Sequence, residues 1–203
     1  MEHNNENLLE TNLDQAYWNK RWEKNETGWD IGYPSPAIVH YMDDYPNKKA
    51  SILIPGCGNG YEAEYLVSKG FQQITLVDIA PLAVENLKKK YAHIPQIHVI
   101  CADFFHLEGQ FDLMIEQTFF CALSPSLRST YVAKTASLLK EKGKLIGLLF
   151  NREFGNEFPP FGGNEQQYRN LFEPYFHIRK MENCYNSILP RANSELFIHL
   201  IKK

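Results

Sequence analysis

Cysteine is scarce in this sequence, and its few copies are widely spaced. The four cysteines form no C-x-x-C pair and have no histidine at zinc-finger spacing; they are Cys57, Cys101, Cys121 and Cys184. This spacing argues against a disulfide framework and against a zinc site. Reduced thiols are typical of the cytosol, so we expect a cytoplasmic protein that binds no metal.

Long apolar runs and runs of one charge are also missing. No stretch is apolar over a length that spans a bilayer, and residues 1–14 are rich in Asn and Glu without the apolar core of a signal peptide. Lys and Arg are dispersed and the formal net charge is -3, so the sequence offers no basic face to a nucleic acid. We therefore expect a monomer that acts on a small molecule, with no nucleic-acid or membrane partner.

From residue 51 onward, short apolar segments alternate with helical ones. We predict strands at 51–55, 73–78, 96–101, 111–116 and 144–150, and helices at 61–69, 80–91, 124–140 and 164–172. This alternation predicts an α/β fold with a doubly wound, mostly parallel sheet. The last two β segments, 175–182 and 195–201, have no helix between them. They predict an antiparallel hairpin at one edge, which makes the sheet seven-stranded.

All three tryptophans lie before the first predicted strand. Residues 14–23 predict a short amphipathic helix that carries Trp18 and Trp22 at helical spacing, and Trp29 follows in a turn-rich piece. Tryptophan faces attract cations such as a methyl sulfonium, although packing of the helix on the sheet explains these residues equally well. The predicted division of the chain is a flexible tail at 1–13 and one domain at 14–203, with an aromatic lid over a cofactor at 14–36.

A glycine-rich loop and an acidic residue together indicate an adenosine-type cofactor. The loop places Gly56, Gly58 and Gly60 between the first predicted strand and its helix, at the sheet edge where α/β proteins bind ligands. Asp78 ends the second strand, where a carboxylate can accept hydrogen bonds from both ribose hydroxyls. The alternatives are a βα turn without a ligand and, for Asp78, a role in capping the next helix.

Two details favour S-adenosylmethionine over a nicotinamide dinucleotide. The spacing G-x-G-x-G differs from the dinucleotide pattern G-x-G-x-x-G, whose third glycine serves a pyrophosphate that a sulfonium cofactor lacks. After the third strand, Asp103 is placed to accept from an adenine amino group, and Phe104 to donate its backbone N–H to a ring nitrogen. A solvated loop acid is the alternative for Asp103.

These motifs occur together in one known family. The sequence resembles the thiopurine S-methyltransferase family, and within it the halide and thiol methyltransferases of plants and bacteria. The matching stretches are YWNKRW at 17–22, TGWD at 27–30, PGCGNG at 55–60, VDI at 77–79, FD at 111–112, FFCAL at 119–123 and PPF at 159–161. The resemblance implies a Rossmann-like class I methyltransferase fold with S-adenosylmethionine as the cofactor.

The resemblance also implies which residues contact the cofactor. They are Trp18, Trp22, Trp29, Gly56, Gly58, Asp78, Asp103, Phe104 and Gln117. Thiopurine methyltransferases carry an arginine near the substrate at the position of Gln117, and smaller residues where this chain has Phe119 and Phe120. The run Phe-Phe-Cys-Ala is instead the halide and thiol pattern, which argues against a thiopurine substrate.

The implied reaction is SN2 transfer of a methyl group to a small soft nucleophile, namely a thiol, hydrosulfide or a halide. Such a nucleophile arrives ready to attack, so no residue is predicted to act as acid, base or nucleophile. The predicted substrate pocket consists of Phe119, Phe120, Arg152, Phe158 and Phe161. Packing in the core explains each phenylalanine equally well. The alternative functions are a thiopurine S-methyltransferase, a nicotinamide-dependent oxidoreductase and a non-catalytic cofactor-binding domain.

Overall fold

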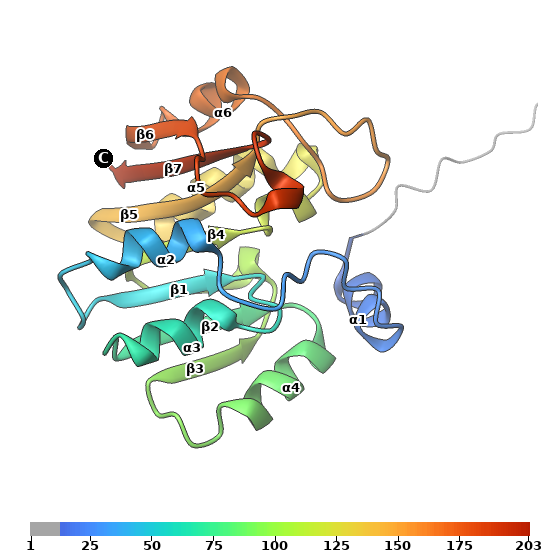
Figure 1. Cartoon of the computed structure of the whole chain (residues 1–203), viewed down its shortest axis with the longest axis vertical. Coiled ribbons are helices and arrows are strands. Elements are labelled where there is room, and N and C mark those ends of the chain that lie inside the picture. The colour runs from blue at the N-terminus through green and yellow to red at the C-terminus, as the bar shows by residue number, and fades with distance from the viewer. Residues whose placement is uncertain (1–12) are drawn as a thin grey trace, which may run out of the picture.

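A computed structural model describes residues 13–203 as a single twisted sheet with helices on both faces (Figure 1). The strands lie in the order β3-β2-β1-β4-β5-β7-β6. Their bounds are β1 Ser51–Pro55, β2 Gln73–Asp78, β3 Ile97–Cys101, β4 Phe111–Gln117, β5 Leu139–Phe150, β6 Phe176–Asn183 and β7 Glu195–Lys202. Strands β1 to β5 pair in parallel, and β7 pairs antiparallel with β5 and β6. The predicted fold class is confirmed.

Two apolar cores hold the helices to the sheet. Helices α2, α3 and α4 pack on one face, where Ile38, Leu66 and Leu87 are buried; α5 and α6 pack on the other, where Tyr131 and Phe172 are fully buried (Figure 1). The helix bounds are α1 Gln15–Glu23, α2 Pro36–Asp43, α3 Tyr61–Ser68, α4 Pro81–Lys90, α5 Arg128–Leu138 and α6 Glu165–Phe172. Burial of side chains of this size on both faces is the main stabilising term of such a sheet.

The structure differs from the sequence prediction at three places. The helix α2 was not predicted, although Pro36 at its first position is a typical helix start. The helix predicted at 124–140 begins later, because a short 3-10 turn at Pro125–Leu127 precedes α5. Strand β5 begins at Leu139 rather than at residue 144, because its first residues pair irregularly with the start of β4.

The strand order reverses between β1 and β4, and this reversal positions the site. Strand β1 connects through α3 to β2 on one side, whereas the chain later returns to β4 on the other side of β1. Pro55 lies beside Val77, and Asp78 lies beside Cys101, so β1, β2 and β3 end at the same edge. A crevice outside the carboxyl ends of strands at such a reversal is where open α/β sheets bind ligands.

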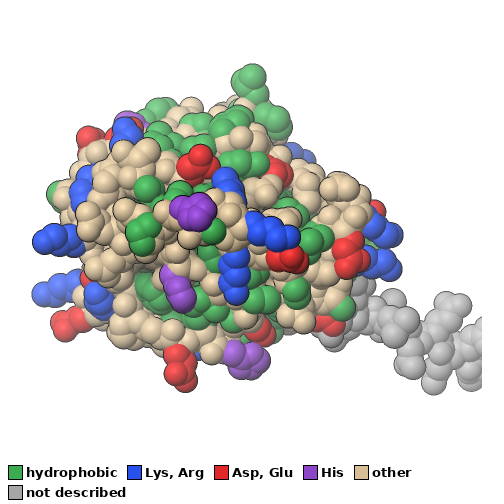
Figure 2. Space-filling view, turned by 90° about the horizontal axis from the view of Figure 1, so that it is seen from below, with side chains coloured by type: hydrophobic (Ala, Val, Ile, Leu, Met, Phe, Trp, Pro, Cys, Tyr) green, Lys and Arg blue, Asp and Glu red, His purple; other side chains and the backbone are tan. Residues whose placement is uncertain are grey.

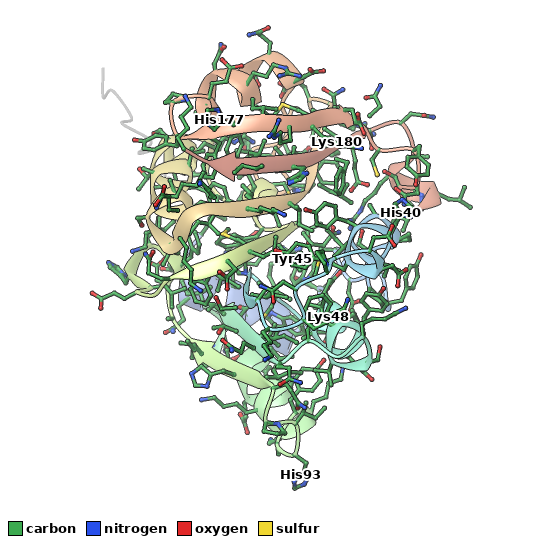
Figure 3. The ribbon with its side chains drawn as sticks, turned by 90° about the vertical axis from the view of Figure 1, so that its left-hand side faces the viewer. His40, Tyr45, Lys48, His93, His177 and Lys180 are labelled. Atoms are coloured by element: carbon green, nitrogen blue, oxygen red, sulfur yellow. The ribbon has the colours of Figure 1, made fainter. Side chains whose placement is uncertain are left out.

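Away from that edge, the surface has mixed charge and one smaller cavity. Basic and acidic side chains are interspersed on the face seen in Figure 2. A cavity of about 350 Å³ lies beside α2 and is lined by residues that include His40, Tyr45 and Lys180 (Figure 3). No helix within residues 13–203 combines the length and the apolar character needed to cross a membrane.

Candidate functional site

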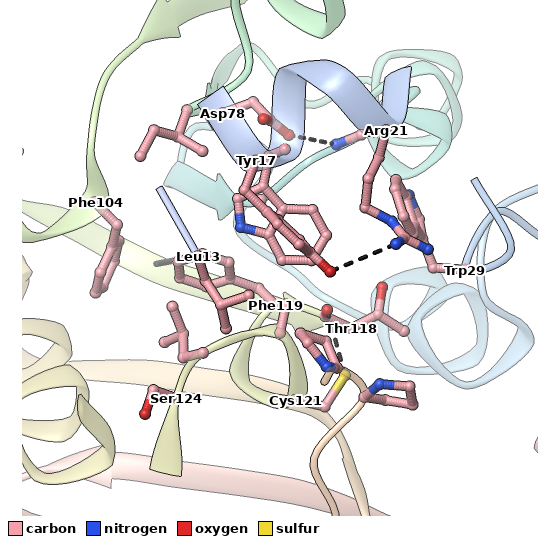
Figure 4. Close-up of a pocket in the computed structure, with 18 of the residues that line it drawn as sticks. Leu13, Tyr17, Arg21, Trp29, Asp78, Phe104, Thr118, Phe119, Cys121 and Ser124 are labelled. Atoms are coloured by element: carbon pink, nitrogen blue, oxygen red, sulfur yellow. Dashed lines mark hydrogen bonds between the residues drawn. The ribbon is translucent and has the colours of Figure 1, made fainter. Parts of the chain in front are cut away.

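A cavity among the described residues lies at the carboxyl edge of the sheet (Figure 4). Its volume is about 660 Å³, which is within the usual range for small-molecule sites. One side is formed by the glycine loop, the ends of β2 and β3, and α1. The other side is formed by the segments that follow β4 and β5 and by the loop before β7. We call these the cofactor side and the acceptor side.

On the cofactor side, Asp78 fixes the glycine loop. Its two carboxylate oxygens accept the N–H groups of Gly58 (3.1 Å) and Ala80 (2.9 Å). Burial raises the pKa of this carboxyl, whereas those two N–H donors lower it. Gly56 and Gly58 adopt positive φ of 55° and 53°, which favours glycine at both positions. The alternative role for Asp78, capping of the next helix, is not found, because the N-cap of α4 is Ala80 and no side chain caps it. Asp78 holds the backbone of Ala80 and also lines the cavity.

The loop after β3 brings Asp103 and Phe104 to the same side. Asp103 accepts the N–H of Phe105 (2.9 Å) and lies 3.4 Å from the His106 ring nitrogen. Phe104 is 3% exposed, and its ring packs 5.2 Å from that of Phe119. Both predicted adenine-contacting residues thus line the cavity.

The three tryptophans gather around the glycine loop. Trp29 makes edge-to-face contacts with Trp18 (5.6 Å) and with Trp22 (6.0 Å). A Cβ atom added to Gly58 would lie 3.9 Å from both Trp22 and Trp29, so the rings stand directly across from the loop. The Arg21 guanidinium lies 5.8 Å from the Trp29 ring centroid, which shows that a cation fits against this ring.

Four hydrogen-bonded anchors hold the N-terminal segment to the rest of the fold. Asn19 accepts the N–H of Leu82 at 2.8 Å, and the Trp29 carbonyl accepts from Arg191 at 3.0 Å. Asp30 accepts from the side chains of Asn59 and Tyr61, and Glu62 accepts the N–H of Ser35 at 3.0 Å. Sequence reasoning missed Asp30 and Arg191, because their partners lie far away along the chain.

The acceptor side has an apolar wall, which we define as Thr118, Phe119 and Cys121 (Figure 4). The Phe119 ring covers Gly56, where a Cβ atom would overlap it. The Cys121 thiol donates to the Thr118 carbonyl at 3.4 Å, and burial raises its pKa to about 12. This cysteine is therefore a neutral thiol near neutral pH, consistent with packing rather than nucleophilic chemistry.

Several residues predicted for the site lie outside the cavity lining. Phe120 is 1% exposed and packs among the rings of Tyr131, Tyr168 and Phe172, so it belongs to the core. Phe158 is 47% exposed. The Phe161 ring is absent from the lining, although its N–H donates to the Cys121 carbonyl at 2.8 Å. Gln117 is also absent from the lining, and its side-chain oxygen is buried without a hydrogen-bond partner within residues 13–203.

Two arginines stand on the acceptor side. Arg152, which the sequence predicted, lines the cavity with its guanidinium 4.8 Å from the Phe154 ring centroid. Arg191 was not predicted; it lines the cavity from the loop before β7 and lies 3.7 Å from the buried carboxylate of Glu195. The side chains of Arg191 and Glu195 are 12% and 3% exposed, so their charges are poorly screened by solvent.

The residues present fit an adenosyl sulfonium cofactor. Backbone can approach a ligand closely at Gly58, where a Cβ atom would meet nothing nearer than 3.9 Å, whereas at Gly56 the missing Cβ atom makes room for the Phe119 ring. The carboxylates of Asp78 and Asp103 face the same space as the tryptophan rings, which attract cations. Leu13 and Asp14 also line this space. Residues 1–12 of the predicted tail lie outside the described residues.

The fold is that of a class I methyltransferase. A solved structure of 1,6-didemethyltoxoflavin-N1-methyltransferase from Burkholderia thailandensis, with 1,6-didemethyltoxoflavin and S-adenosylhomocysteine bound, has a TM-score of 0.74 to this chain. The match covers 93% of this chain and 87% of the other at 16% identity. Identity this low shows likeness of fold alone.

Sequence comparison gives the family. The thiopurine S-methyltransferase family model matches residues 13–199. A probable thiol methyltransferase 2 from Arabidopsis thaliana is 35% identical over 164 residues, covering 77% of this chain and 71% of the relative. Thiocyanate methyltransferase 1 from Brassica oleracea is 28% identical over 194 residues, covering 93% and 85%. The chain belongs to the thiopurine S-methyltransferase family, and it is an S-adenosylmethionine-dependent methyltransferase.

Proposed function

We propose that the cofactor side of the cavity holds S-adenosylmethionine. In this proposal Asp78 accepts from the ribose hydroxyls, while Asp103 and the backbone of Phe104 meet the adenine. The tryptophan rings cover the sulfonium end, because a cation is stabilised against an aromatic face. When bound, the cofactor supplies a methyl group already activated by the sulfonium.

We propose further that the methyl acceptor is a small soft nucleophile: a thiol, hydrosulfide or a halide. The observation that carries this proposal is that no base stands on the acceptor side. The described residues that line the cavity include no histidine and no lysine, their carboxylates Asp14, Asp78 and Asp103 stand on the cofactor side, and Cys121 is a neutral thiol. A hydroxyl or amine acceptor must lose a proton during transfer, whereas a thiolate or halide has none to lose.

The acceptor side is suited to bind such an anion and to remove its water. The wall residues Phe119 and Cys121, together with Phe154 and the prolines at 159–160, offer an apolar surface. Arg152 adds positive charge beside it, which favours an anionic acceptor, whereas the charge of Arg191 is offset by Glu195. Orientation and desolvation of the nucleophile are then the contribution of this chain to the rate. The names of the two plant relatives, a thiol and a thiocyanate methyltransferase, agree with this acceptor class.

A matched pair of acceptors tests the proposal. We expect thiophenol to be methylated and phenol to give no product above background, because the two differ in the nucleophilic atom and in the need for a base. Hydrosulfide, iodide and 6-mercaptopurine complete the panel, with methylated product measured by mass spectrometry. Turnover of phenol at a rate close to that of thiophenol would contradict the soft-acceptor proposal.

A thiopurine acceptor is the second candidate, and one observation favours it. Phe120, one of the two phenylalanines that stand where thiopurine methyltransferases have smaller residues, lies in the core and does not narrow the cavity. Against this candidate, Gln117 stands where thiopurine enzymes carry an arginine. A higher kcat/KM for 6-mercaptopurine than for hydrosulfide, thiophenol and iodide alike would select this candidate.

We also propose a cytoplasmic monomer with no nucleic-acid partner. All four cysteines are free, which agrees with a reducing compartment. The mixed charge of the face in Figure 2 offers no basic patch there for a nucleic acid. Size-exclusion chromatography with light scattering tests the monomer, and a mass of about twice 23.6 kDa would contradict it.

A further inference from the structure

A carboxylate is buried directly behind the acceptor wall. Glu116 lies near the carboxyl end of β4 and is 0% exposed. One of its oxygens accepts the N–H groups of Phe119 and Phe120, each at 2.8 Å. The other oxygen accepts the Tyr131 hydroxyl at 2.6 Å. Among the described residues, the donors to this carboxylate therefore come from the turn that forms the acceptor wall and from α5.

The turn that forms the wall is wrapped around this carboxylate. Thr118 has a φ of 58°, a left-handed conformation that is uncommon for a residue with a β-branched side chain. The next two N–H groups then point back to Glu116, and Cys121 bonds to the carbonyl of Thr118. The turn places the Phe119 ring over Gly56, so the wall meets the glycine loop there.

The fold makes room for an acid at this position and gives it no cation. Gly147 lies beside Glu116 on β5, and a Cβ atom there would overlap the Glu116 backbone. Among the described residues, no ion pair involves Glu116, and burial raises its pKa to about 7 despite the three donors. An apolar side chain would avoid the cost of burying a carboxyl. The carboxylate instead accepts three hydrogen bonds, two from the backbone of the turn and one from Tyr131 on α5.

We propose that Glu116, held by Tyr131, is the positioning residue of the acceptor wall. Its carboxylate fixes the backbone of Phe119 and Phe120, and this backbone sets where Phe119 and Cys121 stand beside the nucleophile. The proposal rests on the proposed function, because the wall is assigned to the acceptor there. It predicts that the carboxylate governs the KM of the acceptor and leaves the affinity for the cofactor product nearly unchanged.

The test uses three variants and two independent measurements. Glu116→Gln keeps the shape but turns one oxygen into a donor, and Tyr131→Phe keeps the buried ring but removes the hydroxyl. Asp112→Asn is the matched control, because Asp112 lies at the opposite end of the same strand and also holds several donors. All are made with Cys101→Ser, which removes the exposed cysteine. The two measurements are acceptor KM against kcat, and the alkylation rate of Cys121 followed by mass spectrometry. The dissociation constant of S-adenosylhomocysteine is determined for each variant as a check on the cofactor side.

We expect Glu116→Gln to raise acceptor KM about tenfold, since one buried hydrogen bond to a charged group is lost. Alkylation of Cys121 should accelerate at least about fivefold, because its turn loosens. The dissociation constant of S-adenosylhomocysteine should stay within about twofold. Tyr131→Phe should raise acceptor KM and the alkylation rate of Cys121 as well, but by smaller factors than Glu116→Gln. If Glu116→Gln does not fold, the result for Tyr131→Phe tests the proposal. Asp112→Asn should change neither quantity.

Three results would overturn the proposal. KM and Cys121 alkylation within twofold of the parent would show that the carboxylate does not hold the wall. Equal changes in Asp112→Asn would show general loosening of β4, and an equal loss of S-adenosylhomocysteine affinity would show that Glu116 shapes the whole site. A chain that methylates no thiol or halide, yet exposes Cys121 only when Glu116 or Tyr131 is changed, would refute the proposed acceptor and support the positioning role.

Discussion

The cofactor side and the acceptor side of the cavity are built in different ways. Apart from α1, the cofactor side consists of short stretches at the carboxyl ends of β1, β2 and β3, where Asp78 and Asp103 are tied to nearby backbone N–H groups. The acceptor side is assembled from the segments after β4 and β5 and the loop before β7, which are far apart in sequence. In the proposed function, the cofactor therefore lies at the strand ends of the scaffold, whereas the acceptor lies among loops.

The largest expected effect is on the cofactor side, at Asp78. We expect Asp78→Ala to weaken binding of S-adenosylhomocysteine about a hundredfold, because two charge-assisted hydrogen bonds of roughly 1.5–3 kcal/mol each are lost. Titration calorimetry measures this, and Asp43→Asn on the surface serves as the control. An unchanged dissociation constant in Asp78→Ala would show that Asp78 does not bind the ribose. The division of the cavity into a cofactor side and an acceptor side would then lose its support.

The second prediction concerns the pH dependence of the acceptor side. Without a base on the acceptor side, the kcat/KM of a thiol of pKa about 8.5 should rise about eightfold from pH 7 to 8, because only the thiolate reacts. Iodide has no proton to lose, so its kcat/KM should vary far less over the same range. The Cys121 thiol, with a pKa of about 12, stays protonated and adds no slope. If kcat/KM had the same pH dependence for the thiol and for iodide, a base of the protein would be taking the proton from the thiol, contrary to this prediction.

Sequence reasoning reached the cofactor side and only part of the acceptor side, for a physical reason. Gly56, Asp78 and Asp103 each follow a predicted strand, and the parallel order of β1, β2 and β3 brings their ends together. Phe120 illustrates the limit: adjacent residues in the turn after β4 point to opposite sides, so Phe119 lines the cavity and Phe120 fills the core. Periodicity does not resolve such a turn.

Long-range partners account for the rest of what sequence reasoning missed. Arg191 reaches the cavity because the antiparallel strand β7 begins beside the end of β5, at Glu195 and Phe150. Glu116 is the last residue of the strand predicted at 111–116, and nothing in the neighbouring sequence shows that its donors come from a turn and from α5. Both positions depend on tertiary packing, which a pattern along one segment does not contain.

The third prediction compares two parts of the N-terminal segment, helix α1 and the residues that follow it. Helix α1 has no buried residue, whereas the piece from Trp29 to Ser35 is anchored through Asp30, Arg191 and Glu62. On addition of S-adenosylhomocysteine, amide exchange should slow about fivefold across α1 and less across residues 30–35, because the second piece is already held. Equal protection of α1 with and without the ligand, measured by mass spectrometry, would mean that residues 14–36 are not a lid.

The smallest expected effect concerns which phenylalanines of the segment after β5 belong to the acceptor side. Phe154 lines the cavity and its ring lies 4.9 Å from that of Phe150, whereas Phe158, four residues later, is 47% exposed and outside the lining. Phe158→Ala should leave the acceptor kcat/KM within about twofold, because the loss of an exposed ring changes little. Phe154→Ala should lower it several-fold, because it removes apolar surface that strips water from the nucleophile.

The two phenylalanines make a matched pair, since the same substitution is made in the same segment and only the direction of the ring differs. Both variants should keep the affinity of the wild type for S-adenosylhomocysteine, because the segment forms no part of the cofactor side. A larger loss in Phe158→Ala than in Phe154→Ala would mean that the segment after β5 closes further over the acceptor when ligand binds. The acceptor side would then be defined by a rearranged loop, in contrast to the preformed cofactor side.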